Sequence, residues 1–280
     1  DPACGSGAFP MGVLQKIVQA LQKLDPDAEW WKKRQIDRIK NPTVKKLLKE
    51  KLSSSGVEYA RKIGVIQNSL YGVDIQPVAA EISKLRCFLS LIVDENIDET
   101  KPNRGIEPLP NLEFKFVTAD TLRNLPEEKQ RSMFDNFEEL QKLEDLRNEY
   151  IQSSGKSKAK VKEQFLKVQR KIAKDQSTLF ADTNSKAYKL GNWNPFSNDK
   201  RDWFDPKWMF GVEKFDVVIG NPPYVDIKAL PKESVKDYFK RFETTSNRIN
   251  LYSIFIERGC HFISDKGVLA YIHPNSLLVN

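Results

Sequence analysis

The sequence predicts an α/β protein with a mainly parallel sheet and helices on both of its faces. Short apolar runs end in turn residues or acids, as buried strands do, and segments with apolar residues at helical spacings separate them. The length of 280 residues suits one large domain or two small ones. Because open α/β sheets bind ligands beyond the carboxyl ends of their strands, the residues after each run are the candidates for function.

The first candidate is a glycine-rich turn, residues 1–9 (Asp-Pro-Ala-Cys-Gly-Ser-Gly-Ala-Phe), which precedes a helical pattern of apolar residues. Gly5 and Gly7 allow positive φ angles and let a ligand approach the backbone closely. Such a turn before a helix is typical of nucleotide-type cofactor sites. The spacing is not the full G-x-G-x-x-G, and no Lys-Ser/Thr pair for a triphosphate follows. An ordinary tight turn is the alternative.

Two further strands are expected to end in acids. Residues 71–74 precede a helix expected over residues 79–93, and in dinucleotide folds an acid after the second strand binds the ribose hydroxyls. Asp74 fits that role, with a helix-capping carboxylate as the alternative. The alternating segment 114–120 is the next expected strand, and Asp120 ends it.

The most informative segment is the apolar run 215–219 with the Asn-Pro-Pro-Tyr loop that follows it. Pro222 and Pro223 stiffen this loop and remove two backbone N–H donors. What remains is a cluster of acceptors, chiefly the side-chain oxygen of Asn221, beside the aromatic face of Tyr224. This set suits a planar group that bears an NH2, such as a nucleobase edge, better than a phosphate or a carboxylate.

Two insertions are expected to interrupt the strand–helix order. Residues 25–62 predict helices with these packing positions: Trp30, Trp31, Ile36, Ile39, Val44, Leu47, Leu48 and Leu52. Residues 127–174 predict a charged helical hairpin, whose lysine-rich stretch either tracks phosphates or is a solvated face. Residues 180–200 predict a surface loop. A fifth strand is expected at residues 267–272, followed by His273 in a loop or capping role.

Composition agrees with this interpretation without establishing it. The net charge is +7, as expected for a phosphate-binding surface, although many other proteins are mildly basic. The three cysteines are scattered and lack metal-ligand spacing, so we expect no metal site and a reducing compartment, the cytoplasm. There is no signal-peptide pattern, and the apolar stretch 88–93 is too short to span a membrane.

The order of four motifs in this sequence resembles that of adenine-N6-specific DNA methyltransferases. The motifs are the glycine-rich turn, Gly-Val-Asp-Ile at residues 72–75, Ala-Asp at residues 119–120 and Asn-Pro-Pro-Tyr. The resemblance is strongest to the methylase part of type IIG restriction–modification enzymes. It implies a Rossmann-like, S-adenosylmethionine-dependent methyltransferase core. Residues 1–280 would then be a partial catalytic domain, incomplete at both ends. The upstream and target-recognition regions, and any endonuclease activity, would lie outside it.

The resemblance also implies roles for individual residues. The residues implied to bind the cofactor are Asp1, Ala3, Cys4, Gly5, Ser6, Gly7, Asp74, Ile75, Asp120 and Asn221. The residues implied to act on the target are Asn221, Pro222, Pro223 and Tyr224. The partner would be double-stranded DNA with a flipped-out adenine. The alternatives are a methyltransferase for RNA or protein glutamine, and an inert binding module.

Overall fold

The fold is seen in a computed structural model that describes residues 1–37, 56–94, 99–100, 104, 111–127, 137–153, 155–176, 182–245 and 250–275. Its strands are β1 (Gly72–Asp74), β2 (Phe116–Thr118), β3 (Phe215–Gly220) and β4 (Ile263–Tyr271). The helices before β3 are α1 (Ala8–Leu24), α2 (Glu29–Asp37), α4 (Val57–Ser69), α5 (Pro77–Ile92), α6 (Phe137–Gln152), α7 (Gly155–Asp175), α8 (Lys186–Gly191) and α9 (Pro206–Phe210). The helices after it are the 3-10 turn η2 (Ile227–Ala229), α10 (Lys232–Arg241) and α11 (Leu251–Phe262).

The strands form two parallel pairs, β1–β2 and β3–β4, rather than the one continuous sheet that the sequence predicts. Parallel pairing is therefore confirmed, and the described residues do not form a full Rossmann sheet. On the edge of β1 that does not pair with β2, the backbone of the glycine-rich turn is hydrogen-bonded to the strand. Val73 donates to the Asp1 carbonyl and Cys4 donates to the Val73 carbonyl, both at 2.9 Å.

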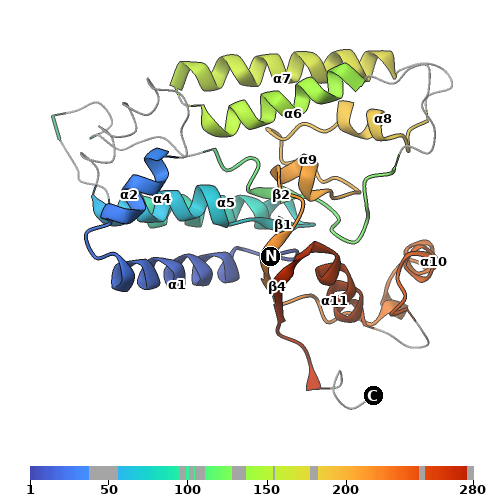
Figure 1. The fold of residues 1–280 in the computed structure, drawn as a ribbon. Coiled ribbons are helices and arrows are strands. Elements are labelled where there is room, and N and C mark those ends of the chain that lie inside the picture. The colour runs from blue at the N-terminus through green and yellow to red at the C-terminus, as the bar shows by residue number, and fades with distance from the viewer. Residues whose placement is uncertain are drawn as a thin grey trace.

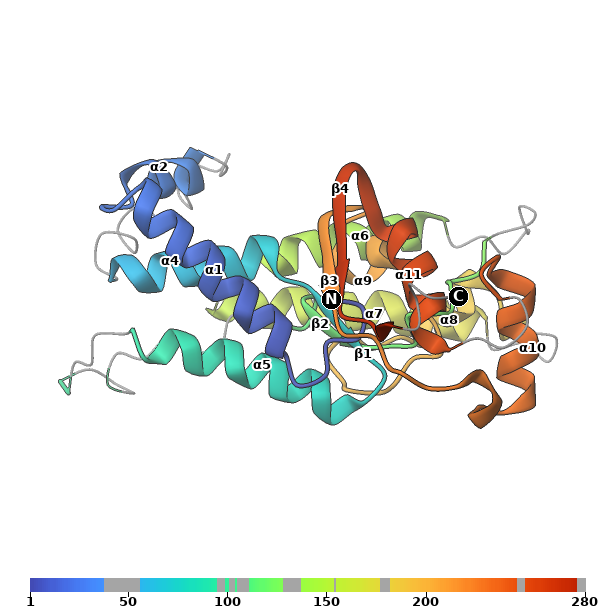
Figure 2. The same ribbon diagram turned by 90° about the horizontal axis from the view of Figure 1, so that it is seen from below.

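Helices cover both faces of the sheets, as expected for an α/β protein. On one face α1, α4 and α5 bury apolar residues such as Leu14, Val65 and Leu91 against β2 (Figure 1). Helices α6 to α9 bury a larger aromatic cluster, which also includes Val73 of β1, Val117 of β2 and Val218 of β3. A third cluster joins α10 and α11 to the loops beyond the strands. Helices α1 and α5 lead away from the carboxyl ends of the strands, and α10 lies at the opposite side (Figures 1 and 2).

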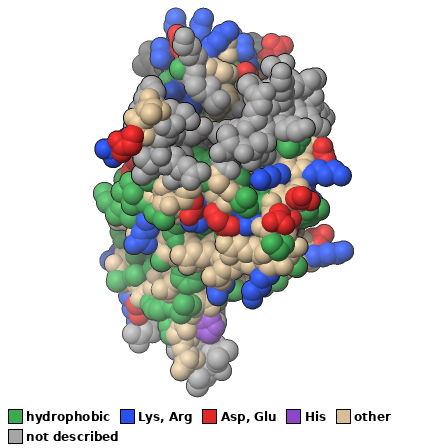
Figure 3. All heavy atoms as spheres, turned by 90° about the vertical axis from the view of Figure 1, so that its left-hand side faces the viewer, with side chains coloured by type: hydrophobic (Ala, Val, Ile, Leu, Met, Phe, Trp, Pro, Cys, Tyr) green, Lys and Arg blue, Asp and Glu red, His purple; other side chains and the backbone are tan. Residues whose placement is uncertain are grey.

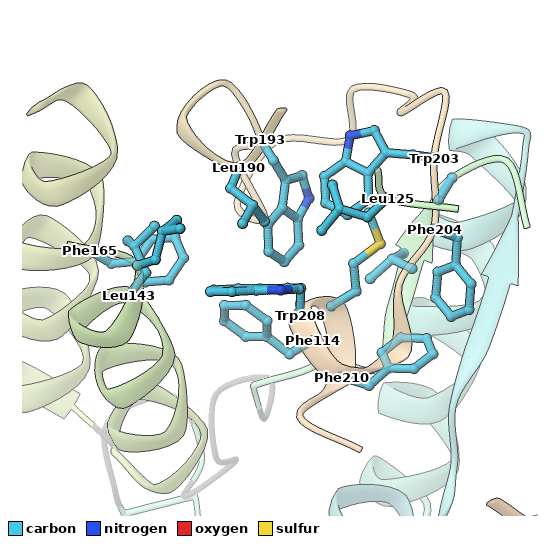
Figure 4. Close-up of a cluster of buried hydrophobic side chains, with 14 of the residues drawn as sticks. Phe114, Leu125, Leu143, Phe165, Leu190, Trp193, Trp203, Phe204, Trp208 and Phe210 are labelled. Carbon is cyan, nitrogen blue, oxygen red and sulfur yellow. The ribbon is translucent and has the colours of Figure 1, made fainter. Parts of the chain in front are cut away.

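Where a helical hairpin was expected, the consecutive helices α6 and α7 contact each other and turn apolar residues toward the core. Helices α6 and α7 bury Leu143, Leu146, Tyr150 and Phe165. In Figure 4, Leu143 and Phe165 point toward residues of the α8–α9 region. The hairpin is thus a layer of the core rather than a solvent-exposed arm. The ends assigned to both insertions remain predictions.

Three local expectations are wrong. The strand expected at residues 114–120 is β2, and it covers only residues 116–118. It begins late because the N–H groups of Lys115 and Phe116 donate back to the Leu112 carbonyl in a turn. The segment 180–200 is not merely a surface loop, because it contains α8 and buries Leu190 and Trp193.

Trp30 was expected to pack, but its side chain is 54% exposed, while its neighbour Trp31 is buried against Gly64. Two adjacent helical residues point in different directions, so only one of them can face α4. The expected packing positions from Ile39 to Leu52 lie outside the described residues.

The end of the molecule remote from α10 carries a mixed surface. Figure 3 shows hydrophobic side chains there, interspersed with both basic and acidic ones, rather than one basic field. Within the described residues, no helix has the length and apolar character that crossing a membrane requires.

Candidate active site

The glycine-rich turn and the Asn-Pro-Pro-Tyr loop meet at the side chain of Asp1. Its Oδ1 atom accepts a hydrogen bond of 3.0 Å from the Ala3 backbone N–H. A Cβ atom built on Gly220 would lie 2.5 Å from this Oδ1, so a larger residue at the end of β3 would displace the Asp1 carboxylate. Asp1 Oδ2 is buried and has no hydrogen-bond partner among the described residues. Two segments far apart in sequence therefore share one carboxylate.

Gly5 and Gly7 both have positive φ angles, but they face different surroundings. At Gly5 (φ 53°) nothing lies within 4 Å of where a Cβ would stand. At Gly7 (φ 84°) the same atom would lie 2.8 Å from Ser83 Oγ and 3.1 Å from Ser83 Cα. The space at Gly5 is thus open to a ligand, whereas Gly7 lets the turn pack against α5.

A matched pair of substitutions tests this difference. Both Gly5→Ala and Gly7→Ala introduce backbone strain of roughly 1 kcal/mol. We expect Gly7→Ala to lower thermal stability further, because the new methyl group clashes with α5. Gly5→Ala should leave stability closer to that of the parent and should weaken ligand binding instead. Differential scanning calorimetry measures the first effect, and equal melting temperatures for the two variants would contradict the assignment.

Asp74 ties the glycine-rich turn to the start of α5. Its Oδ2 accepts the Gly5 N–H at 2.8 Å, and its Oδ1 accepts the Gln76 N–H at 2.9 Å. The N-cap residue of α5 is Gln76. Asp74 lies two residues earlier and is therefore not the helix N-cap, which was the alternative role for its carboxylate. The Asp74 side chain is partly exposed, and each oxygen retains a second lone pair for a ligand. Next to it, Ile75 is 41% exposed and offers an apolar surface.

Cys4 is a packing residue in this turn. Its side chain is buried, and burial raises the pKa of its thiol to about 11. The thiol therefore stays protonated at neutral pH and is not a nucleophile. The neighbouring Ser6 is half-buried.

Asp120 lies in the loop after β2, in basic surroundings. Its Oδ1 accepts the Leu122 N–H at 3.1 Å, and its Oδ2 lies 3.6 Å from Arg123 Nε. Burial raises the pKa of this carboxyl, and Arg123, Lys200 and Arg241 oppose that shift by favouring the charged form.

Two residues that the sequence analysis missed hold this loop in place. Thr121 Oγ1 donates to the Pro2 carbonyl at 2.7 Å, and the buried Arg258 of α11 donates to the Thr121 carbonyl at 2.8 Å. The loop after β2 is thereby joined to the glycine-rich turn. The signal for Arg258 was a single cation among apolar residues such as Ile254 and Phe262 on one helix face, which indicates a buried polar contact.

The Asn-Pro-Pro-Tyr loop exposes the two side chains that the sequence singled out. Asn221 is exposed, and Tyr224 is 46% exposed. The Tyr224 hydroxyl lies 2.7 Å from Asn221 Oδ1 and 3.0 Å from the Ile272 carbonyl, the two acceptors available to its proton. The Tyr224 ring meets the buried Tyr252 edge-on, with centroids 6.0 Å apart. Tyr252 was also missed, although it lies in the apolar start of α11.

The other two loop residues support this arrangement. Pro222 is buried and Pro223 is half-buried, so the loop rests on its prolines while its polar residues face outward. Nδ1 of His273 lies 3.0 Å from the Pro274 carbonyl. That contact agrees with the expected loop role rather than with a catalytic base.

These groups fit a positively charged nucleotide-like cofactor. The fit rests on the open space at Gly5, the partnerless buried oxygen of Asp1, and the acceptors of Asp74 and Asp120. Carboxylates accept hydroxyl, amino and ammonium protons, and none of them suits a phosphate. Within the described part of the chain, no group of three or more His, Cys, Asp or Glu side chains is arranged to hold a metal ion.

Comparisons with known proteins place this site in a family. Over 99% of its length the chain is 26% identical to a putative type II restriction enzyme and methyltransferase of Methanocaldococcus jannaschii, and it covers 26% of that protein. Over 28% of its length it is 33% identical to a type II methyltransferase of Geobacillus stearothermophilus, of which it covers 16%. Over 24% it is 39% identical to one of Pseudomonas aeruginosa, of which it covers 12%. The chain thus spans about a quarter or less of these curated relatives.

No solved structure matches the chain. The family model described as Eco57I restriction-modification methylase matches residues 68–280, which is well over half of the chain and includes Asp74, Asp120 and the Asn-Pro-Pro-Tyr loop. The chain therefore belongs to the Eco57I restriction-modification methylase family.

Proposed function

We propose that this chain transfers a methyl group from S-adenosylmethionine to the N6 amino group of an adenine flipped out of duplex DNA, as part of a restriction–modification system. The observation that carries the proposal is the exposed Asn221 amide beside the half-exposed Tyr224 ring, at the carboxyl end of β3 and against the glycine-rich turn. Family membership supports the same conclusion.

The Asn221 side chain and the Pro222 carbonyl receive the target amino group in this proposal. Each accepts one N6 hydrogen, which draws the nitrogen lone pair out of conjugation with the ring and toward the methyl donor. An amide oxygen has two lone pairs, so Asn221 Oδ1 can keep its bond to Tyr224 and still accept from adenine. The protein supplies position rather than a nucleophile.

The Tyr224 ring receives the face of the flipped base. Adenine cannot be reached inside the duplex, and the cost of unstacking it is a few kcal/mol. Stacking on an aromatic side chain returns roughly 1–3 kcal/mol of that cost. The edge contact with Tyr252 and the hydroxyl bond to the loop hold the ring in one orientation before the base arrives.

Four residues would hold the cofactor. Asp74 accepts the ribose hydroxyls, and Asp120 accepts the amino group of the cofactor's adenine. The backbone at Gly5 allows close approach, and the partnerless Asp1 Oδ2 accepts from the ammonium group of the methionine part. When bound, the cofactor supplies an activated methyl group on a positively charged sulfur.

Substitution of Tyr224 tests the stacking role. We expect Tyr224→Phe to be mild, because the ring and its edge contact with Tyr252 remain. Tyr224→Ala should slow methylation strongly, by roughly 10- to 100-fold for the loss of about 1–3 kcal/mol. A 2-aminopurine at the target position should fluoresce less in the presence of the alanine variant than with the parent. If the alanine variant methylates as fast as the parent and leaves that fluorescence unchanged, Tyr224 does not stack on the base.

The function itself is tested on the complete natural polypeptide that contains this chain. With S-adenosylmethionine tritiated in its methyl group, we expect label in duplex DNA. Nucleoside analysis should recover this label as N6-methyl-2′-deoxyadenosine. RNA and glutamine-containing proteins serve as competing substrates. Label in cytosine, or only in RNA or protein, would overturn the proposal.

A further inference from the structure

We propose that the outer face of α10 is a docking surface for the DNA phosphate backbone beside the flipped base. This inference rests on the proposed function. The face consists of Lys232, Lys236, Phe239 and Lys240, all exposed, with Phe239 at 44%. The three lysines recur at every fourth residue and so lie along one side of the helix.

The position of α10 places this face next to the target site. The chain passes from Tyr224 through η2 directly into α10, and the Leu251 N–H returns to the Val225 carbonyl at 2.9 Å. In two perpendicular views α10 lies on the same side of the molecule as α11, away from α1, α2 and α4 (Figures 1 and 2). A duplex that presents a base to Tyr224 must bring its flanking phosphates over the neighbouring surface.

The helix is held firmly enough to act as a fixed surface. Its inner face buries Tyr238 and packs near Leu122 and Ile254. On its flank, Asp237 accepts from Arg241 of the same helix at 2.8 and 2.6 Å and lies 3.4 Å from Arg123 in the loop after β2. These contacts leave the lysine face outward.

An ion chain continues from this flank to the proposed cofactor site. Asp237 lies 3.4 Å from Arg123, which lies 3.6 Å from Asp120. Just beyond the helix, Glu257 of α11 accepts the N–H groups of Glu243 and Thr244. These contacts fix the lysine face relative to Asp120 of the proposed cofactor site and relative to α11, which carries Tyr252 beside the target site.

The lysines of this face differ from many others in the chain because their charges are not matched. Lys171, Lys189 and Lys207 pair with acids at 2.5, 2.8 and 3.1 Å. No ion pair within the described residues engages Lys232, Lys236 or Lys240. A row of unmatched cations suits a repeating row of phosphates, and an exposed aromatic ring among them offers contact to a deoxyribose.

The test replaces all three lysines by glutamine in the complete natural polypeptide. The logarithm of the DNA association constant falls linearly with the logarithm of the salt concentration. Each lost phosphate contact should make this slope shallower by about 1, so we expect the triple variant to be shallower by about 2–3. The dissociation constant for DNA at low salt should rise at least about tenfold, equally for target and non-target duplexes. Cofactor binding by calorimetry should not change.

The matched control removes the same charge from α7, at Lys160, Lys167 and Arg170, which are exposed and lie on a different side of the molecule (Figure 1). This control should retain the parent's slope. An unchanged slope in the α10 variant, with an active parent, would overturn this inference alone. So would an equal reduction in the α7 control. A parent that neither binds nor methylates DNA would instead overturn the proposed function, and this inference with it.

Discussion

Replacing Asn221 by alanine should abolish most methylation while cofactor binding is retained. Removing one preorganised hydrogen-bond partner from a reacting centre costs on the order of 10²–10³ in rate. The loss of the Asn221 side chain should slow methylation at least as much. The Asn221 oxygen binds the target amino group and also redirects the lone pair of that nitrogen. The measurement is tritium transfer to duplex DNA under single-turnover conditions, with cofactor affinity from calorimetry.

Two comparison variants sharpen this prediction. Asn221→Asp keeps an acceptor oxygen of the same reach, so it should retain more activity than Asn221→Ala. Asn192→Ala removes an exposed asparagine whose amide donates locally to the Tyr188 carbonyl, and the activity of this variant should equal that of the parent. If Asn221→Ala instead loses cofactor affinity and methylation in the same proportion, its role is to bind the cofactor rather than the target.

Replacing Asp74 by alanine should weaken cofactor binding strongly. The change removes an acceptor for the ribose hydroxyls, and it also frees the Gly5 and Gln76 N–H groups that Asp74 now holds at 2.8 and 2.9 Å. Hydrogen bonds to a charged group contribute about 1.5–3 kcal/mol, which corresponds to roughly 10- to 100-fold in affinity. Calorimetry with S-adenosylmethionine or its demethylated product measures the loss.

A matched acid provides the control for Asp74. Asp182 is exposed and accepts the Asn184 N–H at 2.9 Å, which is a local contact like that of Asp74 with Gln76. Asp182→Ala should leave cofactor affinity unchanged. Asp74→Asn should fall between parent and alanine, because it keeps one acceptor oxygen. Unchanged affinity in Asp74→Ala would refute the ribose assignment.

The expectations that succeeded depend on short-range patterns. A helical face such as Leu143, Leu146 and Tyr150 repeats every three or four residues, and it is buried as predicted. The strand before the Asn-Pro-Pro-Tyr loop is a run of apolar residues interrupted by Asp216 alone and closed by glycine, and β3 ends at Gly220. The expectations that failed depend on partners distant in sequence. Leu190 and Trp193 lie in a polar segment and are buried because the hairpin covers them.

The sequence by itself determined where the strands lie, the turn residues and acids that follow them and the resemblance to a methyltransferase family, because these are local features of type and spacing. Only the tertiary structure decided how those residues meet. The close approach of Asp1 to Gly220, the bond from Thr121 to Pro2 and the contact of Arg258 with Thr121 each join segments distant in the chain. No local periodicity encodes such contacts, because they arise from the packing of separate elements around one core.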